Sequence, residues 1–171
     1  MWELSGVELA IISDTHMPRR GRTLPRECVE RLRAADLILH AGDVMEAEVL
    51  AEIEAFGPPV HAVRGNVDSI GLQARLPLTR IVEADGARIA MLHDSGPADG
   101  RLARLKRRFP DAHAVVFGHS HMPLLEVDSG GGFTIFNPGS PTERRRAPHH
   151  TMGVATAQHG RIAFELVVLE G

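Results

Sequence analysis

The sequence contains very little cysteine, lysine or aromatic side chain. Its 171 residues include one Cys, one Trp and no Tyr, and the only lysine is Lys106. The single Cys28 excludes an internal disulfide framework and a thiolate-rich metal cluster, and its position in an amphipathic stretch predicts a small buried side chain. A P-loop nucleotidase is excluded as well, because no glycine-rich loop closes on Gly-Lys-Ser/Thr and Lys106 lies on a predicted helix.

Long apolar runs and a strong charge of either sign are also missing. No apolar run approaches the roughly 20 residues that cross a membrane, so we expect no membrane partner. Residues 1–4 have neither the basic start nor the apolar core of a signal peptide, which predicts a cytoplasmic protein. The formal net charge of -3 gives no basic footprint for general nucleic-acid binding.

The composition is that of an ordinary globular chain, with 43% hydrophobic and 24% charged residues. A chain of 171 residues is long enough for one domain with a full hydrophobic core. We find no internal repeat, low-complexity tract or linker. The prediction is therefore a single domain that covers residues 1–171.

Apolar runs and turn residues predict strands that alternate with helices in the first half and mostly strands in the second. The expected strands are about 8–13, 37–43, 60–63, 81–83, 88–92, 114–117, 124–127, 133–136, 151–157 and 161–169. Three helices are expected: one that begins near Pro25, one at 46–56 and one at 101–109. Asp85-Gly86 is a favoured hairpin turn. This order predicts an α/β protein in which two sheets pack face to face with helices outside.

Five of these strands end in side chains that bind hard metal ions. Ligands in open α/β sheets bind beyond the carboxyl ends of the strands, so these side chains are expected to converge. The seven candidates are Asp14, His16, Asp43, Asn66, His93, His119 and His121. Their convergence predicts a metal site.

Seven ligands are too many for one ion. Two ions that share a carboxylate would each obtain four protein ligands and keep open positions for water and substrate. Carboxylate, amide and imidazole ligands without thiolate suit Mn, Fe, Co, Ni or Zn, of which we favour Mn, better than a site for magnesium alone or calcium. Two such ions would hold a bridging hydroxide for in-line attack on phosphorus, which predicts a phosphohydrolase.

A serine hydrolase is the competing catalytic interpretation. The segment Gly118-His119-Ser120-His121-Met122 begins like a nucleophile elbow. It ends in Met where that motif has Gly, and a proline follows where a helix should begin. We reject this interpretation.

The ordered motifs resemble those of the calcineurin-like metallophosphoesterase superfamily. They are Asp14-Thr15-His16, Gly42-Asp43, Gly65-Asn66-Val67-Asp68, His93, Gly118-His119-Ser120-His121 and Asn137-Pro138-Gly139-Ser140. The short chain and the Gly-Asn-x-Asp variant resemble the small single-domain phosphodiesterases of the YfcE type. The resemblance implies a four-layer α/β/β/α sandwich.

The resemblance also implies a division of the ligands between two metals. One metal would be held by Asp14, His16, Asp43 and His121. The other would be held by Asp43, Asn66, His93 and His119. Within this set, the residues expected to take part in catalysis are Asp43, Asn66 and His93.

Two positions depart from the family pattern. Phosphatases of the superfamily often have Gly-Asn-His-Glu, with the His placed as an acid near the leaving group, where this chain has Val67-Asp68. Asp94-Ser95 follows His93 where a Gly commonly stands. The missing acid matters most for poor, basic leaving groups, because good leaving groups need no proton. A diester carries one negative charge and repels a hydroxide less than a dianionic monoester does, so we expect diesters to be preferred.

Other polar residues have simpler explanations. We expect His40 to be buried or to orient a ligand, and His61 and His113 to be structural. A solvated turn is expected for 149–150, and Asp68 is either a turn residue or a partner of a ligand. The arginines of 144–146 are expected to be solvated, and a phosphate clamp is the alternative.

The sequence thus predicts a metal-dependent phosphohydrolase, with a phosphodiesterase favoured over a phosphomonoesterase and small phosphate esters as substrates. The alternative is a catalytically weak scaffold for protein interactions, as in the retromer's phosphoesterase-like subunit. All seven candidate positions hold residues that can bind metal, which favours the enzyme. Assembly of the chain into a homo-oligomer is compatible with the sequence.

Overall fold

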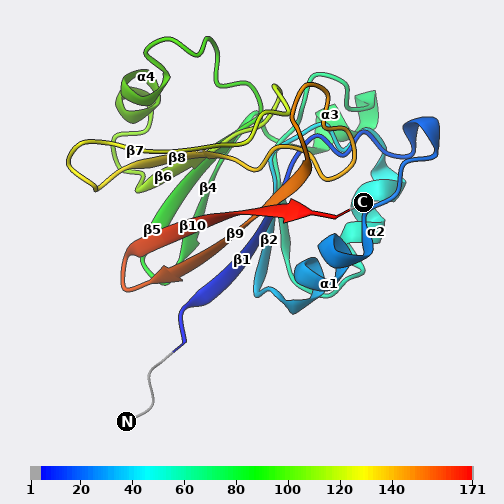
Figure 1. Ribbon diagram of the computed structural model, residues 1–171, viewed down its shortest axis with the longest axis horizontal. Helices are drawn as coiled ribbons and strands as arrows, with labels where there is room; N and C mark the ends of the chain where they lie inside the picture. The colour runs from blue at the N-terminus through cyan, green and yellow to red at the C-terminus, as the bar shows by residue number, and fades with distance from the viewer. Residues whose placement is uncertain (1–4, 171) are drawn as a thin grey trace.

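Two five-stranded sheets form the centre of the computed structural model, which describes residues 5–170 (Figure 1). The first sheet has the order β10-β9-β1-β2-β3 and the second the order β4-β5-β6-β8-β7. The strands of the first sheet are β1 Val7–Ile12, β2 Leu37–His40, β3 Val60–Ala62, β9 His150–Gln158 and β10 Arg161–Leu169. Those of the second are β4 Thr79–Ala84, β5 Ala87–Leu92, β6 Ala114–Val116, β7 Leu124–Val127 and β8 Thr134–Asn137.

Helices cover the outer faces of both sheets. They are α1 Arg26–Ala34, α2 Ala47–Glu54, α3 Ile70–Arg75 and α4 Arg101–Arg108, with a 3₁₀ turn η1 at Arg19–Gly21. In Figure 1, α1 and α2 lie beside the first sheet, whereas α4 lies beyond the second. The predicted four-layer α/β/β/α sandwich is confirmed.

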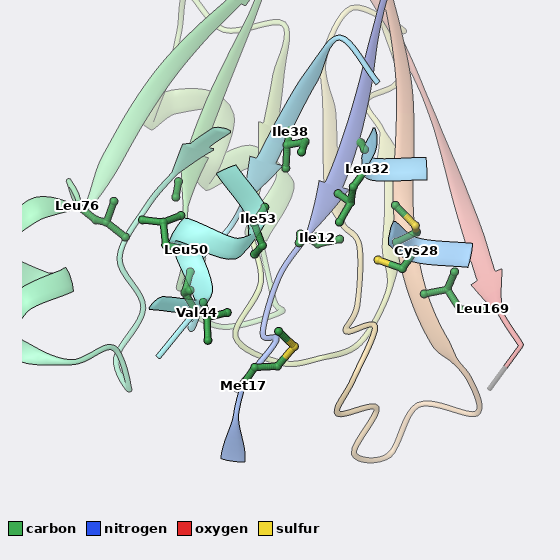
Figure 2. Close-up of a cluster of buried hydrophobic side chains, with 14 of the residues drawn as sticks. Ile12, Met17, Cys28, Leu32, Ile38, Val44, Leu50, Ile53, Leu76 and Leu169 are labelled. Carbon is green, nitrogen blue, oxygen red and sulfur yellow. The ribbon is translucent and has the colours of Figure 1, made fainter. Parts of the chain in front are cut away.

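Three apolar clusters fill the spaces between the four layers. The first cluster joins strands of the first sheet to α1 and α2, and Figure 2 shows Cys28 and Leu32 of α1 within it. The second lies between the sheets and includes Ile11, Ile89 and Phe136. The third packs Leu105 of α4 against the second sheet. The prediction that Cys28 is buried is confirmed, since none of its surface is exposed.

The β4–β5 hairpin follows from its turn residues. Asp85 and Gly86 both have positive φ, 42° and 80°, as a two-residue turn of type I′ requires. Six residue pairs align β4 and β5, from Thr79 with Leu92 to Ala84 with Ala87. The predicted hairpin is confirmed, although both strands begin slightly earlier than expected.

Two short elements were not predicted. They are the turn η1 at Arg19–Gly21 and the helix α3 at Ile70–Arg75. Only Leu72 of α3 is buried, and Ile70 is 88% exposed, so the helix has no apolar stripe that a sequence pattern could reveal. Its one local signal is Ser69, whose side chain accepts a hydrogen bond from the Leu72 N–H.

None of the helices in residues 5–170 has the length and apolar content needed to cross a membrane. Residues 1–4, on which the expectation about a signal peptide rests, lie outside the described part of the chain.

Strand direction brings the candidate ligands to one edge. Strands β1, β2 and β3 run parallel, and β5 runs parallel to β6, so their carboxyl ends lie together within each sheet. The Asp14 N–H donates to the Gly42 carbonyl at 2.9 Å, and the Gly118 N–H donates to the His93 carbonyl at 3.0 Å. A side-chain contact of 2.7 Å from His93 Nδ1 to the Ala41 carbonyl joins the two sheets there.

Candidate metal centre

The seven candidate ligands follow five strands, and most of them stand on strained backbone. Asp14, His16, Asp43, His119 and His121 all have positive φ, between 46° and 72°. This left-handed conformation is unfavourable for residues with a Cβ atom and persists only where the surroundings enforce it. Such residues concentrate at functional sites, and here five of the seven candidate ligands have this conformation.

Each of the two carboxylates uses one oxygen for structure and turns the other toward the histidines. Asp14 Oδ2 accepts hydrogen bonds from the Ser13 hydroxyl at 2.7 Å and from the His119 N–H at 3.0 Å. Asp43 Oδ1 accepts the Val67 N–H at 3.0 Å. The second oxygens, Asp14 Oδ1 and Asp43 Oδ2, are thereby held in fixed positions.

A first group of ligand atoms surrounds Asp14 Oδ1. This oxygen lies 3.8 Å from His16 Nε2 and 3.5 Å from His121 Nε2. All three atoms are buried, and none makes a hydrogen bond in the structure. Buried polar atoms without partners are costly, and three of them facing one another are what a bound cation would satisfy. These residues therefore fit a metal ion.

A second group lies beside the first and is more open. Asp43 Oδ2 is 3.2 Å from both His16 Nε2 and His93 Nε2, so it stands between the two groups. Asn66 Oδ1 is 3.1 Å from His93 Nε2 and 3.1 Å from His119 Nδ1. Asn66 is exposed and the His119 side chain is 44% exposed, which gives this side access to solvent.

The electrostatics favour a cation. Burial would raise the pKa of Asp43, but the neighbouring His16 and His93 outweigh it and hold that pKa well below its usual range. Burial would lower the pKa of His16, but Asp14 and Asp43 outweigh it and raise that pKa to about 9. Two buried carboxylates thus demand positive charge, and without a metal a protonated imidazole supplies it.

Three glycines leave room for the ligand side chains. A Cβ atom on Gly65 would lie 2.0 Å from Asp43 Oδ1, and one on Gly118 would lie 2.6 Å from Asp14 Oδ2. A Cβ atom on Gly42 would lie 2.5 Å from His93 Nδ1, and this glycine also has a φ of 100°. The Gly-Asp, Gly-Asn and Gly-His pairs of the sequence therefore have a steric cause.

Glu143 contacts two of the histidines and was not found from the sequence. Its carboxylate lies 3.3 Å from His16 Nδ1 and receives a 3.0 Å hydrogen bond from Arg22, and its backbone carbonyl contacts His121 Nδ1. Metal-binding histidines commonly donate their second ring N–H to such groups, which fixes the ring orientation. Glu143 lies 127 residues from His16, so no local sequence signal could have revealed it.

His40 and Asp68 support the ligand loops. His40 is fully buried; its Nδ1 accepts the Gly42 N–H at 3.2 Å, and its Nε2 lies 3.0 Å from the Thr15 hydroxyl. Asp68 accepts the N–H groups of Met45 and Gly65 at 2.8 and 2.7 Å, which ties the loop after β2 to the loop after β3. The expectation for His40 is confirmed, and Asp68 is a partner of the loops that carry Asp43 and Asn66.

The remaining polar candidates lie elsewhere, with one exception. His113 accepts the Arg88 N–H at 2.9 Å at the start of β6, the end opposite His119, and is structural as expected. His149 is exposed. Arg145 is exposed, but its guanidinium lies 3.4 Å from the His119 carbonyl, so this arginine is next to the ligand loops.

The sequence profile of the calcineurin-like phosphoesterase superfamily domain matches residues 7–160. The chain belongs to this superfamily, and two curated relatives are named as probable metallophosphoesterases. The chain is 33% identical over 141 residues to a probable metallophosphoesterase of Methanothermobacter thermautotrophicus. The aligned region covers 80% of this chain and 78% of the relative.

Solved structures show the same fold. A Thermotoga maritima protein is 28% identical, with a TM-score of 0.73 over 95% of this chain and 99% of that one. Vps29 of Chaetomium thermophilum is 18% identical, with a TM-score of 0.77 over 94% of this chain and 97% of that one. At 18% identity the likeness to Vps29 concerns the fold alone.

Proposed function

We propose that this protein is a phosphodiesterase that depends on two divalent transition-metal ions. The observation that carries the proposal is the pair of adjoining ligand groups with Asp43 Oδ2 between them, 3.2 Å from a histidine of each. The first ion would be held by Asp14, His16, Asp43 and His121. The second would be held by Asp43, Asn66, His93 and His119.

The donor set supports manganese or a similar ion. Carboxylate, amide and imidazole groups without thiolate match Mn, Fe, Co, Ni and Zn, and we favour Mn. When bound, the two ions would activate a water molecule as the nucleophile and neutralise the phosphate oxygens. Hydrolysis then forms one bond from phosphorus to the water oxygen and breaks the bond to the leaving alcohol.

The protein side chains would set the direction of substrate approach. Asp14 and His121 are completely buried, whereas Asn66 is exposed and His119 is partly exposed. A phosphate ester would therefore enter over Asn66 and His119. Glu143 and His40 would keep the ligand loops in place without touching the substrate.

Val67 supports the preference for diesters. Its backbone N–H holds Asp43, and its partly buried apolar side chain cannot donate a proton to a leaving group. General acid catalysis contributes roughly 10²-fold to 10⁴-fold, so its absence penalises basic leaving groups most. A singly charged diester also repels an anionic nucleophile less than a dianionic monoester does.

A scaffold for protein interactions was the alternative. Such a protein could lose a ligand without harm, yet all seven positions here hold residues that can bind metal, and five of them keep strained backbone. We therefore favour the enzyme. Strain of this kind is unfavourable for stability and is retained where a site needs it.

The test is hydrolysis of two esters with the same aryl leaving group. Metal-free protein reconstituted with Mn²⁺ should cleave bis(4-nitrophenyl) phosphate with a higher kcat/KM than 4-nitrophenyl phosphate. A chelator should abolish both activities, and Mn²⁺ should restore them. Faster cleavage of the monoester would contradict the diesterase proposal, and activity that survives the chelator would contradict the metal dependence.

A further inference from the structure

A cavity of about 330 Å³ adjoins the more open ligand group. Asn66 and His93 form the part of its wall that belongs to the proposed metal centre, and Leu78 and Leu92 form an apolar part. Leu78 is 62% exposed, so its apolar surface is accessible to a ligand. The cavity is therefore a place where one arm of a substrate can lie while its phosphate is at the metals.

Two arginines from different elements line the same cavity. Arg64 precedes the Gly65-Asn66 pair after β3, and Arg108 is the last residue of α4 on the outer face of the other sheet. Within residues 5–170 neither guanidinium forms an ion pair with a carboxylate. Arg64 donates one hydrogen bond to the Gln73 carbonyl at 3.1 Å, and Arg108 lies over the Phe109 ring. Most of their N–H donors remain available to a ligand.

One carboxylate, that of Asp94, also lines the cavity. Asp94 Oδ1 accepts the Gly96 N–H at 2.8 Å, and its Oδ2 lies 4.0 Å from His119 Nε2. Within residues 5–170, two guanidiniums without a carboxylate partner therefore line the cavity against one carboxylate. The charged side chains that line the cavity therefore have a net positive charge, and Leu78 adds an apolar surface beside them.

We propose that this cavity is a substrate subsite for an ester arm with an apolar stem and a terminal anionic group, either a carboxylate or a second phosphate. The inference rests on the proposed function, because the arm belongs to the ester cleaved at the metal centre. The stem packs on Leu78 and Leu92. Arg108 and Arg64 bind the terminal anion, since a guanidinium can donate two parallel hydrogen bonds to it.

The test uses three diesters that differ only in the charge of one arm. All three carry a 4-nitrophenyl leaving group, and the second arm is propyl, 3-carboxypropyl or 3-aminopropyl. Binding of a partly exposed anion by arginine is expected to lower KM for the carboxylate arm about tenfold relative to the propyl arm, which is about 1.4 kcal/mol. The amino arm should raise KM, and kcat should change little because the leaving group is the same.

A matched pair of variants locates the effect. Arg108→Met should reduce the preference for the carboxylate arm by at least about threefold, or 0.65 kcal/mol, through a change in KM. Arg107→Met removes the neighbouring charge of α4, which does not line the cavity, and should leave the preference unchanged. Arg108→Lys keeps the charge but loses the two-pronged geometry and should restore part of the preference.

The outcomes separate the two proposals. Equal KM values for the three arms in the unmodified protein would overturn the subsite while leaving the phosphodiesterase intact. An equal loss in Arg107→Met and Arg108→Met would overturn it too, since the preference would then reflect the general charge of α4. Failure to cleave any of the three diesters with Mn²⁺ present would overturn the proposed function and the subsite with it. The comparison among arms does not depend on the variants folding.

Discussion

Gly65→Ala is the substitution that most sharply tests the geometry of the site. The added Cβ atom would lie 2.0 Å from Asp43 Oδ1 and 2.3 Å from the Asp43 backbone nitrogen. Real Cβ contacts are essentially never shorter than 3.0 Å, so Asp43 or the Gly65 backbone must move by about 1 Å. Rotation of the Asp43 side chain cannot relieve the contact with its backbone. The residue that stands between the two ligand groups is therefore displaced.

The magnitude follows from this displacement. Overpacking of a close-packed interior costs about 1–3 kcal/mol, which is less than the stability of a typical domain, so the variant should still fold. A misplacement of about 1 Å at a reacting centre can reduce the rate about 10²-fold. We expect Gly65→Ala to lower kcat/KM on an aryl diester by about that factor and to weaken Mn²⁺ binding.

Gly71→Ala is the matched control. Gly71 lies in α3, and a Cβ atom added there would have no neighbour within 4 Å. Alanine is favoured over glycine in a helix, so this variant should be as active as the unmodified protein and up to about 1 kcal/mol more stable.

The assay combines kcat/KM at saturating Mn²⁺ with urea unfolding in the presence of a chelator, because bound metal would itself stabilise the folded state. Full activity and normal Mn²⁺ binding in Gly65→Ala would refute the steric reasoning.

Three further predictions concern the ligands and the leaving group. Asp43→Asn should reduce kcat/KM by at least about 10²-fold because a neutral amide cannot balance the charge of two cations. His61→Asn is the control and should leave kcat/KM nearly unchanged. Similar losses in both variants would mean that the site is misplaced. If the imidazole supplies a proton, Val67→His should flatten the dependence of kcat/KM on the leaving-group pKa, measured across a series of aryl esters. Efficient turnover of alkyl monoesters by the unmodified protein would contradict this reasoning. The pKa of His16 is raised to about 9 in the metal-free chain, so a proton must leave before an ion can bind, and Mn²⁺ affinity should rise with pH up to that value. Calorimetry in buffers of different ionisation enthalpy should detect the released proton near neutral pH, and its absence would argue against His16 as a ligand.

The fold was predictable because its strands are apolar runs with clear turn residues between them. The runs before Asp14, Asp43 and His93 are buried strands, so each reads as a continuous apolar segment. Parallel strands place their carboxyl ends at one edge, which made the convergence of their polar ends predictable as well. The ligand loops come from both sheets of the predicted sandwich, and the contact between His93 Nδ1 and the Ala41 carbonyl joins them.

The parts that were missed depend on contacts distant in sequence. Glu143 reaches His16 only because the chain after β8 folds back over the loop after β1: the Ser140 hydroxyl donates to the Asp14 carbonyl at 2.8 Å. Arg64 and Arg108 share a cavity only because the two sheets pack face to face. Helix α3 is short and has one buried apolar residue, so it lacks the period that identifies longer helices.

The most direct test of the account is a crystal structure of the Mn²⁺-reconstituted protein with anomalous scattering data collected for manganese. We predict two anomalous peaks per chain. One should lie among Asp14, His16 and His121 and the other among Asn66, His93 and His119, with an Asp43 oxygen between them. A single peak, or two peaks away from these side chains, would contradict the two-metal site on which the proposed function rests.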